Sequence, residues 1–510
     1  MENEELKYRI LQNFGFAPTA DQLHAVEVFA RFMTDRDERA VMILRGSAGT
    51  GKTSLAGAIV RTMQELRQKV TLLAPTGHAA KVFSLNANQP AATIHRSIYR
   101  EKAFTGLDGK FNLNVNLFHD RLFMVDEASM ISLSSNNSTF GSGCLLDDLI
   151  QYVYNDHNCR MLLVGDKAQL PPVGEEESAA LRSDVLRAYG LTVYECDLNE
   201  VLRQSQDSGI LYNATVIRQM ITHDEVTQLP KIRFKGFADI SIVPGDELIE
   251  RLASSYSEVG IDETMVITRS NKRANVFNQG IRNMVLGREE ELTTGDMLMV
   301  VKNKYKNTPP PSPSPNGSLN NTTNNVNSLT TQATRQVTQL PSGGGKEIEK
   351  PALTFIANGD RAVVRRVRNV REFYGFRFAD VSLEFPDYNN AEEEMTVILD
   401  ALMTEAPALT QEQNEQLFQH VLEDYEDIPL KADRMKKVRE DEYYNALQVK
   451  FGYAITCHKA QGGQWAHIYL DQGYMTDEML TPDYIHWLYT AFTRATEHLY
   501  LVNWPKTQVE

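Results

Sequence analysis

The chain has 510 residues, 42% of them hydrophobic and 23% charged, and a formal net charge of −15. At ~150 residues per domain this length predicts about three domains. No apolar run approaches the ~20 residues of a membrane span, and the start Met1–Glu5 is acidic where a secretory signal would be basic and then apolar. The cysteines have no paired spacing. We therefore expect a cytoplasmic protein without disulfides or a zinc site.

The negative charge argues at first sight against a nucleic-acid partner. However, 17 acidic and 5 basic residues between Glu384 and Glu442 supply most of it. Basic clusters can still form elsewhere, as at Arg361–Arg377, although alternate residues of a strand usually just face water. The net charge therefore excludes no partner.

Residues 1–196 alternate short apolar runs with helix-like stretches, which predicts a parallel sheet covered by helices. The segment Phe104–Phe111 indicates the tip of a hairpin inserted at about 97–120, and Ser132–Gly143 indicates a loop. The strand candidates are Val41–Leu44, Val70–Ala74, Leu122–Val125, Met161–Val164 and Thr192–Cys196, and the helix candidates include Lys52–Arg67 and Cys144–Tyr154.

The segment Gly46–Thr53, Gly-Ser-Ala-Gly-Thr-Gly-Lys-Thr, lies between the first strand candidate and a helix. Its glycines let backbone N–H groups converge on phosphate oxygens, and the helix presents its positive end to the same charge. Lys52 would reach the β- and γ-phosphates, and Thr53 would ligate Mg²⁺. The alternative is a glycine turn that merely links strand to helix. We predict a nucleoside triphosphate site formed by Gly46, Ser47, Ala48, Gly49, Thr50, Gly51, Lys52, Thr53 and Ser54.

Two further strand candidates end in polar residues. After the strand Leu122–Val125, Asp126 would hold Mg²⁺ and Glu127 would polarise the attacking water. In Gly165–Pro172, the amide of Gln169 could sense a γ-phosphate, although this segment could also be a plain proline-terminated turn. With the glycine-rich segment upstream, Asp126 and Glu127 complete a predicted NTPase site.

A second α/β pattern begins near Thr264, breaks off, and resumes near Tyr453. The interruption contains β-rich parts, then acidic, helix-prone sequence from Glu392 to about Tyr425. Within it, Asn307–Gly345 is rich in Pro, Ser, Asn and Gly, which predicts disorder. The β-rich parts are Asp296–Val301, Asp360–Val367 and Tyr374–Leu383; in the α/β halves we expect strands at Met265–Thr268, His467–Leu470 and His498–Val502, and helices at Lys272–Met284 and Tyr484–Arg494.

In their order along the chain, these motifs resemble the superfamily 1B DNA helicases of the RecD-like and Dda-like branch (exodeoxyribonuclease V alpha-chain-like ATPases). The resemblance runs through nearly the whole chain, and an ordered series is far more specific than any one motif. The similar segments are Pro18–Gln22, Gly46–Thr53, Ala74–Gly77, Thr93–Arg96, Asp126–Glu127, Gly165–Pro172, Glu200–Gln204, Thr268–Asn271, Ala454–Gly463 and Trp487–Ala495.

The resemblance implies an α/β fold with two RecA-like P-loop NTPase domains, an SH3-like β-rich insertion and a short β-hairpin. The first RecA-like domain would be residues 1–196. The second would combine residues 197–295 and 446–510. The SH3-like domain would be residues 296–445, containing the disordered 307–345.

The resemblance also implies roles for single residues. Gln22 would read the adenine edge of ATP, and Arg203 and Arg494 would act as arginine fingers, although an arginine near a helix is usually a solvated surface charge. Two positions depart from the family: His78 stands where a basic residue is common, and Gln464 stands where a glutamate often contacts the ribose. The Gln464 amide would then make that contact to the nucleotide. The residues expected to face the DNA strand are Thr76, His95, Asn271, Thr456 and His458, of which the two histidines could equally be structural.

Phe104 and Phe111 flank the proposed hairpin tip. In the family, a hairpin in this place splits the duplex, and an aromatic ring there could stack on a base. The alternative is that the two rings only stabilise the hairpin by cross-strand pairing.

The function implied is an ATP- and Mg²⁺-dependent motor that translocates 5′-to-3′ on single-stranded DNA and unwinds duplex DNA. Its expected partners are single-stranded DNA, duplex junctions and other repair or replication proteins, with no membrane, and we expect a monomeric motor. Alternatives are an RNA helicase of the same superfamily and a DNA-binding subunit of a repair complex with an idle motor. A P-loop kinase would leave the motifs beyond Lys167 without a purpose.

Overall fold

The computed structural model describes residues 3–101, 111–133, 141–155, 157–200, 207–222, 228–305, 353 and 355–510. Phe104, Arg203 and the segment predicted to be disordered, 307–345, lie outside these residues, so the predictions about them are not tested. Among the described residues, no helix combines the length and the apolar character that a membrane span requires.

The first sheet is parallel and six-stranded, in the order β3-β2-β6-β7-β1-β8. All five strands expected from the sequence are present, and β3 is added at one edge. The strands are β1 (Ala40–Gly46), β2 (Lys69–Ala74), β3 (Ala91–Thr93), β6 (Arg121–Val125), β7 (Arg160–Gly165) and β8 (Thr192–Leu198).

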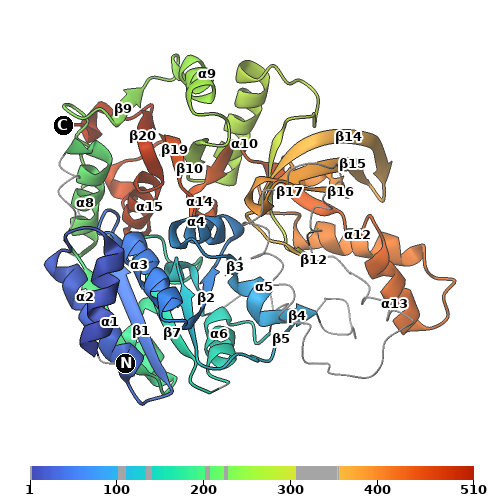
Figure 1. The fold of residues 1–510 in the computed structure, drawn as a ribbon. Coiled ribbons are helices and arrows are strands. Elements are labelled where there is room, and N and C mark those ends of the chain that lie inside the picture. Colours follow the sequence, from blue (N-terminus) through green and yellow to red (C-terminus); the bar gives the residue numbers. More distant parts are fainter. Residues whose placement is uncertain are drawn as a thin grey trace, which may run out of the picture.

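Helices cover both faces of this sheet, as Figure 1 shows in blue and cyan. Successive side chains of a strand point to opposite faces. Accordingly Met42 and Leu44 of β1 join the core beneath α1–α3, whereas Val41 and Ile43 join the core on the α5–α6 side. The helices are α1 (Asn3–Phe14), α2 (Ala20–Thr34), α3 (Lys52–Glu65), α4 (Gly77–Ala87), α5 (Ile94–Ile98), α6 (Leu145–Val153) and α7 (Ser183–Ala188).

The second sheet is parallel and five-stranded, in the order β18-β10-β19-β20-β9. Its strands come from both sides of the interruption seen in the sequence: β9 (Ile240–Val243) and β10 (Thr264–Thr268) before it, and β18 (Ala454–Thr456), β19 (Trp465–Asp471) and β20 (Ala495–Val502) after it. The helices around it are α8 (Gly209–Thr222), α9 (Leu248–Glu258), α10 (Asn271–Gly280), α14 (Cys457–Ala460) and α15 (Pro482–Phe492). Below, the first lobe means the first sheet with its helices, and the second lobe means the second sheet with its helices.

The interruption forms a closed barrel with β strands in the order β11-β14-β15-β16-β17, which confirms that it is β-rich. It lies to one side of the two lobes in Figure 1, in orange. The barrel strands are β11 (Met297–Val300), β14 (Arg361–Phe373), β15 (Phe376–Phe385), β16 (Ala391–Ile398) and β17 (Leu447–Phe451).

The sequence interpretation was wrong for part of the acidic segment. Residues from Glu392 were expected to be helix-prone, but Ala391–Ile398 is strand β16, paired with β15 along its whole length. Its β-branched end, Thr396-Val397-Ile398, favours a strand and is buried. The short 3-10 helix Leu399–Ala401 follows directly, and α-helices begin only at α12 (Gln411–Glu423) and α13 (Lys431–Glu440) in this segment.

Two short antiparallel ladders lie outside the two sheets and the barrel. One pairs β4 (Tyr99–Glu101) with β5 (Phe111–Leu113), so the chain does return on itself at the expected hairpin. The other pairs β12 (Lys304–Tyr305) with β13 (Phe355–Ile356) beside the barrel.

Candidate nucleotide site

The glycine-rich loop joins the end of β1 to the start of α3. Gly49 and Gly51 have φ values of 77° and 79°, which suit glycine because it has no Cβ. A Cβ on Gly46 would lie 2.7 Å from the Thr50 hydroxyl, which itself donates to the Ser47 carbonyl over 2.8 Å. The loop therefore depends on its glycines, as the motif predicts.

Lys52, the first residue of α3, folds back over the loop. Its ammonium donates to the carbonyls of Gly46 (2.5 Å) and Ser47 (2.9 Å). Thr53 and Ser54 follow, exposed, in the first helical turn, where backbone N–H groups have no partner within the helix. A phosphate at this position would meet the helix N-terminus and the Lys52 ammonium, which in this structure donates to two loop carbonyls.

Gln22 is buried, 1% exposed, and its amide is engaged at both ends. Its oxygen accepts from the Thr19 N–H in a capping box at the start of α2. Its nitrogen donates to the Thr50 carbonyl over 2.9 Å. In this arrangement Gln22 holds the loop against α2, and its reading of adenine stays a prediction.

Asp126 and Glu127 follow the end of β6. The Asp126 carboxylate accepts from the Glu127 N–H over 2.9 Å, and Glu127 has a left-handed backbone with φ of 50°, which is costly for a residue with a Cβ. Burial raises the pKa of Asp126, and the neighbouring Glu127 carboxylate raises it further.

These two carboxyls fit the predicted Mg²⁺, since a cation would relieve their mutual repulsion. Within the described part of the chain, no group of three or more His, Cys, Asp or Glu side chains could hold a metal. A site of few protein ligands suits Mg²⁺, which takes its remaining ligands from water and substrate phosphates.

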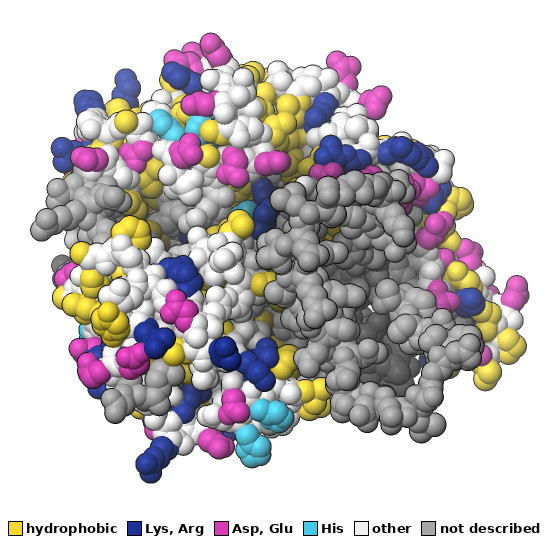
Figure 2. Space-filling view, in the orientation of Figure 1, with side chains coloured by type: hydrophobic (Ala, Val, Ile, Leu, Met, Phe, Trp, Pro, Cys, Tyr) yellow, Lys and Arg dark blue, Asp and Glu magenta, His cyan; other side chains and the backbone are white. Residues whose placement is uncertain are grey.

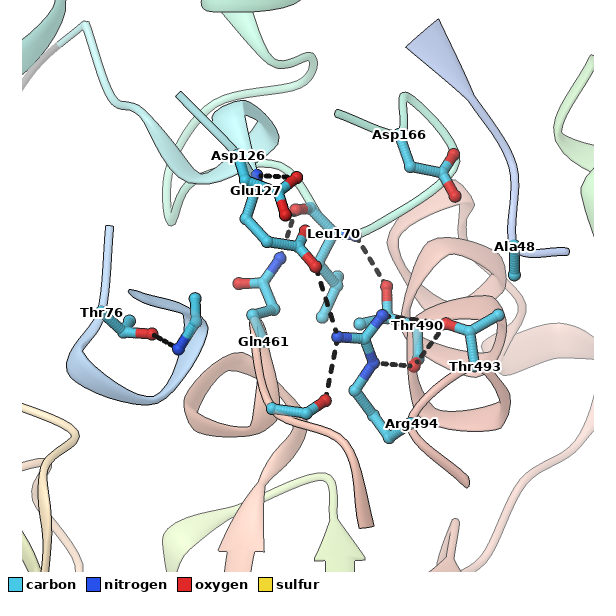
Figure 3. A network of polar contacts seen from close by, with 12 residues as sticks. Ala48, Thr76, Asp126, Glu127, Asp166, Leu170, Gln461, Thr490, Thr493 and Arg494 are labelled. Atoms are coloured by element: carbon cyan, nitrogen blue, oxygen red, sulfur yellow. Dashed lines mark hydrogen bonds and ion pairs between the residues drawn. The ribbon is translucent and has the colours of Figure 1, made fainter. Parts of the chain in front are cut away.

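Arg494 brings the second lobe to these carboxyls. It lies just after α15, is 3% exposed, and places a guanidinium nitrogen 3.9 Å from a Glu127 oxygen. Figure 3 shows it pointing toward Glu127 while held by the Thr490 and Gly463 carbonyls and the Thr493 hydroxyl. Of the two predicted arginine fingers, this one lies beside Glu127, one of the two carboxylates predicted to be catalytic, and Arg203 lies outside the described residues.

The segment after β7 joins the same contact. The Leu170 N–H donates to the Thr490 hydroxyl over 2.8 Å, and the Gln461 amide donates to the Leu170 carbonyl over 2.6 Å (Figure 3). Gln169 is buried, and its side-chain oxygen has no hydrogen-bond partner among the described residues. A buried amide oxygen without a partner calls for an explanation, and the sensing role of Gln169 stays a prediction.

Sequence reasoning missed two residues of the second lobe that touch the glycine-rich loop. The Tyr489 hydroxyl accepts from the Ala48 N–H over 2.9 Å and donates to the Asp166 carboxylate over 2.6 Å. Arg218, on α8, donates to the Ser47 hydroxyl. Tyr489 stands within the motif Trp487–Ala495, but no local pattern distinguishes it from the packed residues around it.

Three of the residues predicted to contact the DNA strand line two adjoining pockets. Asn271 and Thr456 line one pocket with Lys450 and Lys459, and Thr76 lines an adjoining pocket that also includes Lys459. Burial lowers the pKa of each lysine to about 8.

The two predicted histidines lie apart from each other. His458 is exposed on α14, in the element that carries Lys459. His95 lies beside Tyr99, with ring centroids 5.6 Å apart, and burial lowers its pKa to about 4. The ring of His95 is therefore neutral at pH 7.

The two residues that depart from the family's pattern, Gln464 and His78, lie in different surroundings. Gln464 is exposed at the loop before β19. His78 is packed between lobes: its ring stacks on Trp465 of the second lobe, 5.7 Å away and nearly parallel, and its Nδ1 lies 3.4 Å from the Asp387 carboxylate of the barrel.

The arginines on and beside β14 are mostly paired with acids. Figure 2 shows Lys and Arg side chains interspersed with Asp and Glu over this part of the barrel. Four of the six arginines in the cluster noted in the sequence have carboxylate partners: Arg361 with Asp387, Arg365 with Glu384, Arg371 with Asp380 and Glu442, and Arg377 with Glu291 and Asp400. The cluster is therefore largely neutralised within the barrel.

Two family descriptions match the chain. "AAA domain" matches residues 19–229, and "UvrD-like helicase C-terminal domain" matches residues 451–502. The first includes the glycine-rich loop and the carboxyls, and the second includes Arg494.

Relatives with helicase names match about half of the chain. It is 24% identical to the ATP-dependent DNA helicase Dda of Enterobacteria phage T4, over 53% of this chain and 58% of Dda. It is 28% identical to the ATP-dependent RecD2 DNA helicase of Deinococcus radiodurans, over 52% of this chain and 34% of RecD2. The chain thus spans less than two thirds of either helicase.

A longer match is protein R530 of Acanthamoeba polyphaga mimivirus, 23% identical over 91% of this chain and 96% of that protein. Among solved structures, the Pif1 helicase from Bacteroides in complex with ADP-AlF3 and single-stranded DNA is 14% identical, covers 97% of this chain and 95% of that one, and has a TM-score of 0.44. A likeness of that degree does not establish an activity. The two domain matches lie in chain order and, together with the helicase relatives, show that the chain is similar to DNA helicases of the Dda and RecD2 kind.

Proposed function

We propose that the chain is an ATP-dependent DNA helicase. The observation that carries this proposal is the contact of Arg494 with Glu127, because it places a cation of the second lobe beside the carboxyls of the first. A nucleotide bound at the loop between them would be completed only by both lobes together. This is the arrangement that lets hydrolysis drive lobe movement.

The proposed chemistry follows from the placement of the side chains. Lys52 would exchange the carbonyls of Gly46 and Ser47 for phosphate oxygens, and Glu127 would orient and deprotonate the attacking water. Mg²⁺ held at Thr53 and Asp126 would supply charge neutralisation for the phosphates. Arg494 would stabilise the charge that develops on the transferred phosphoryl group.

The proposed nucleic-acid path is the pair of adjoining pockets lined by Thr76, Asn271, Thr456 and Lys459. The pocket with Asn271 and Thr456 lies between the second lobe and the barrel, and the adjoining pocket also includes Thr76 of the first lobe. Hydroxyl, amide and ammonium groups suit phosphates and sugars and carry no sequence information, as a motor requires. We propose single-stranded DNA as the occupant and 5′-to-3′ as the direction of movement.

The finer architecture is also a proposal. The first RecA-like domain would be residues 1–196, the second residues 197–295 with 446–510, and the SH3-like domain residues 296–445. The parallel order of each sheet and the closure of the barrel support these assignments. A monomeric, cytoplasmic motor completes the proposal.

Strand displacement tests the proposed function. Duplexes of DNA and of RNA with a 5′ or a 3′ single-stranded tail are incubated with the chain and ATP, and the release of a labelled strand is followed. We expect release from 5′-tailed DNA, and none with Lys52→Ala, which removes the phosphate-binding ammonium. Release from 3′-tailed DNA would overturn the direction, and preference for RNA would favour an RNA helicase. ATP hydrolysis without release of any strand would contradict the helicase proposal.

A further inference from the structure

The Tyr489 hydroxyl joins the glycine-rich loop to the segment after β7. It accepts from the Ala48 N–H of the glycine-rich loop and donates to Asp166 after β7, over 2.9 and 2.6 Å. The tyrosine belongs to the second lobe, whereas Ala48 and Asp166 belong to the first. One hydroxyl therefore connects two segments of the opposite lobe.

This contact is buried and fully hydrogen-bonded. Tyr489 is 1% exposed and Asp166 3% exposed. Burial and the Asp166 carboxylate raise the pKa of Tyr489 well above its ordinary value, so the hydroxyl keeps the proton that it donates. The other Asp166 oxygen accepts from the Ala168 N–H over 2.9 Å, which fixes the carboxylate in place.

Two other side chains of α15, near Tyr489, contact the segment that follows β7. His486 contacts the Ala168 carbonyl over 2.9 Å, and the Thr490 hydroxyl accepts from the Leu170 N–H over 2.8 Å. Residues spaced by three and four lie on one face of a helix. One face of α15 therefore contacts residues 166–170. Of its three side chains named here, Tyr489 also contacts the glycine-rich loop.

We propose that Tyr489 is a positioning residue that makes the shape of the phosphate-binding loop depend on closure of the lobes. In the closed arrangement, with Arg494 beside Glu127, the hydroxyl holds Ala48 in place. When the lobes separate, both of its hydrogen bonds break together. This inference rests on the proposed function and adds to it a connection between nucleotide occupancy and the movement of the second lobe.

Tyr489→Phe tests the proposal, because it removes the hydroxyl and keeps the ring. The matched control is Tyr484→Phe on the same helix. The Tyr484 hydroxyl is also buried, but it donates to Gln472 within the second lobe. Both variants lose one buried hydroxyl of α15, and only the first loses contacts between lobes.

The first measurement is the Kd of a non-hydrolysable ATP analogue, by fluorescence titration. We expect about fivefold weaker binding for Tyr489→Phe, the factor that corresponds to about 1 kcal/mol for one hydrogen bond, and no change for Tyr484→Phe. The second measurement is the ratio of the Kd values for an oligodeoxythymidine strand without and with the analogue. Binding of two ligands is reciprocally coupled, so this ratio is expected to move toward one only in Tyr489→Phe.

Equal analogue affinity and equal coupling in the two variants would overturn the proposal. If the wild-type chain binds no DNA, the helicase proposal fails, while the analogue affinity still decides the role of Tyr489. If Tyr489→Phe does not fold, Asp166→Asn weakens the same contact while keeping the tyrosine. We expect that variant to weaken analogue binding in the same direction, and unchanged binding would contradict the inference.

Discussion

At the scale of single residues, Arg494 makes contacts within its own lobe and a contact with the other lobe. Three of its contacts are to groups of its own lobe, and one is to Glu127 of the other lobe. Arg494→Lys keeps a cation near Glu127 but cannot reproduce a planar guanidinium with several donors. Comparing Arg494→Lys with Arg494→Ala therefore separates the effect of the positive charge from the effect of the planar guanidinium.

We expect Arg494→Ala to lower the kcat of ATP hydrolysis about 1,000-fold, the lower end of the effect of an arginine finger. Arg494→Lys should recover only a small part of this loss. Steady-state ATPase assays with saturating single-stranded DNA measure both. An unchanged kcat in Arg494→Ala would show that the contact with Glu127 is only structural.

His95 gives a pH dependence whose sign can be stated. Burial lowers its pKa from the ordinary 6.5 to about 4. The unfolded chain therefore binds a proton between these values that the folded chain does not, so this contribution to stability is present above pH 6.5 and is lost as the pH falls toward 4.

His95→Asn should make the free energy of unfolding less dependent on pH between 6.5 and 4, as measured by denaturant titration at several pH values. The same variant should leave the salt dependence of single-stranded DNA binding unchanged at pH 7, because a neutral ring releases no counterion. A shallower salt dependence would indicate that His95 carries charge in the complex.

At the scale of elements, α4 connects the barrel to the first lobe. The Asp387 carboxylate of the barrel is fully buried and lies 3.2 Å from the Lys81 ammonium, 3.4 Å from His78 and 3.4 Å from Arg361. Burial alone would raise the pKa of Asp387, but the hydrogen bond from His78 and the nearby cations hold it well below its ordinary value. Two elements far apart in the sequence are thus joined by one carboxylate.

Asp387→Asn should destabilise the chain by about 3 kcal/mol, because it leaves the buried Arg361 cation without a counter-charge. Denaturant titration followed by circular dichroism measures this loss. The control is Arg365→Gln, which breaks the more exposed pair with Glu384 on the same barrel and should have a much smaller effect. Similar losses in the two variants would mean that Asp387 does not hold the barrel to α4.

At the scale of the whole molecule, the parts that follow local rules could be predicted from the sequence. The parallel strands are short apolar runs, and the glycine-rich loop needs residues that tolerate positive φ, so both leave a local signal. The sequence predicts Asp126 and Glu127 as site residues because they follow such a strand. The sequence therefore predicted most strands of both lobes, whereas several helices, such as α8 and α9, were not among the named candidates.

The contacts between elements could not be predicted in this way. Tyr489 reaches Ala48 across 441 residues, and Lys81 reaches Asp387 across 306, so no spacing or periodicity connects them. Strand β16 was misjudged because its glutamates dominate the composition, whereas its pairing with β15 decides the conformation. These are effects of tertiary structure that override local preference.

The divided origin of the second sheet has a consequence for synthesis on the ribosome. The first sheet ends at Leu198 and can fold early, whereas β18 to β20 and α15 emerge only after the entire barrel. A nascent chain would thus expose a phosphate-binding loop long before Arg494 and Tyr489 exist. We therefore expect incomplete chains to bind ATP without hydrolysing it. Hydrolysis would begin only after synthesis of the second lobe is complete.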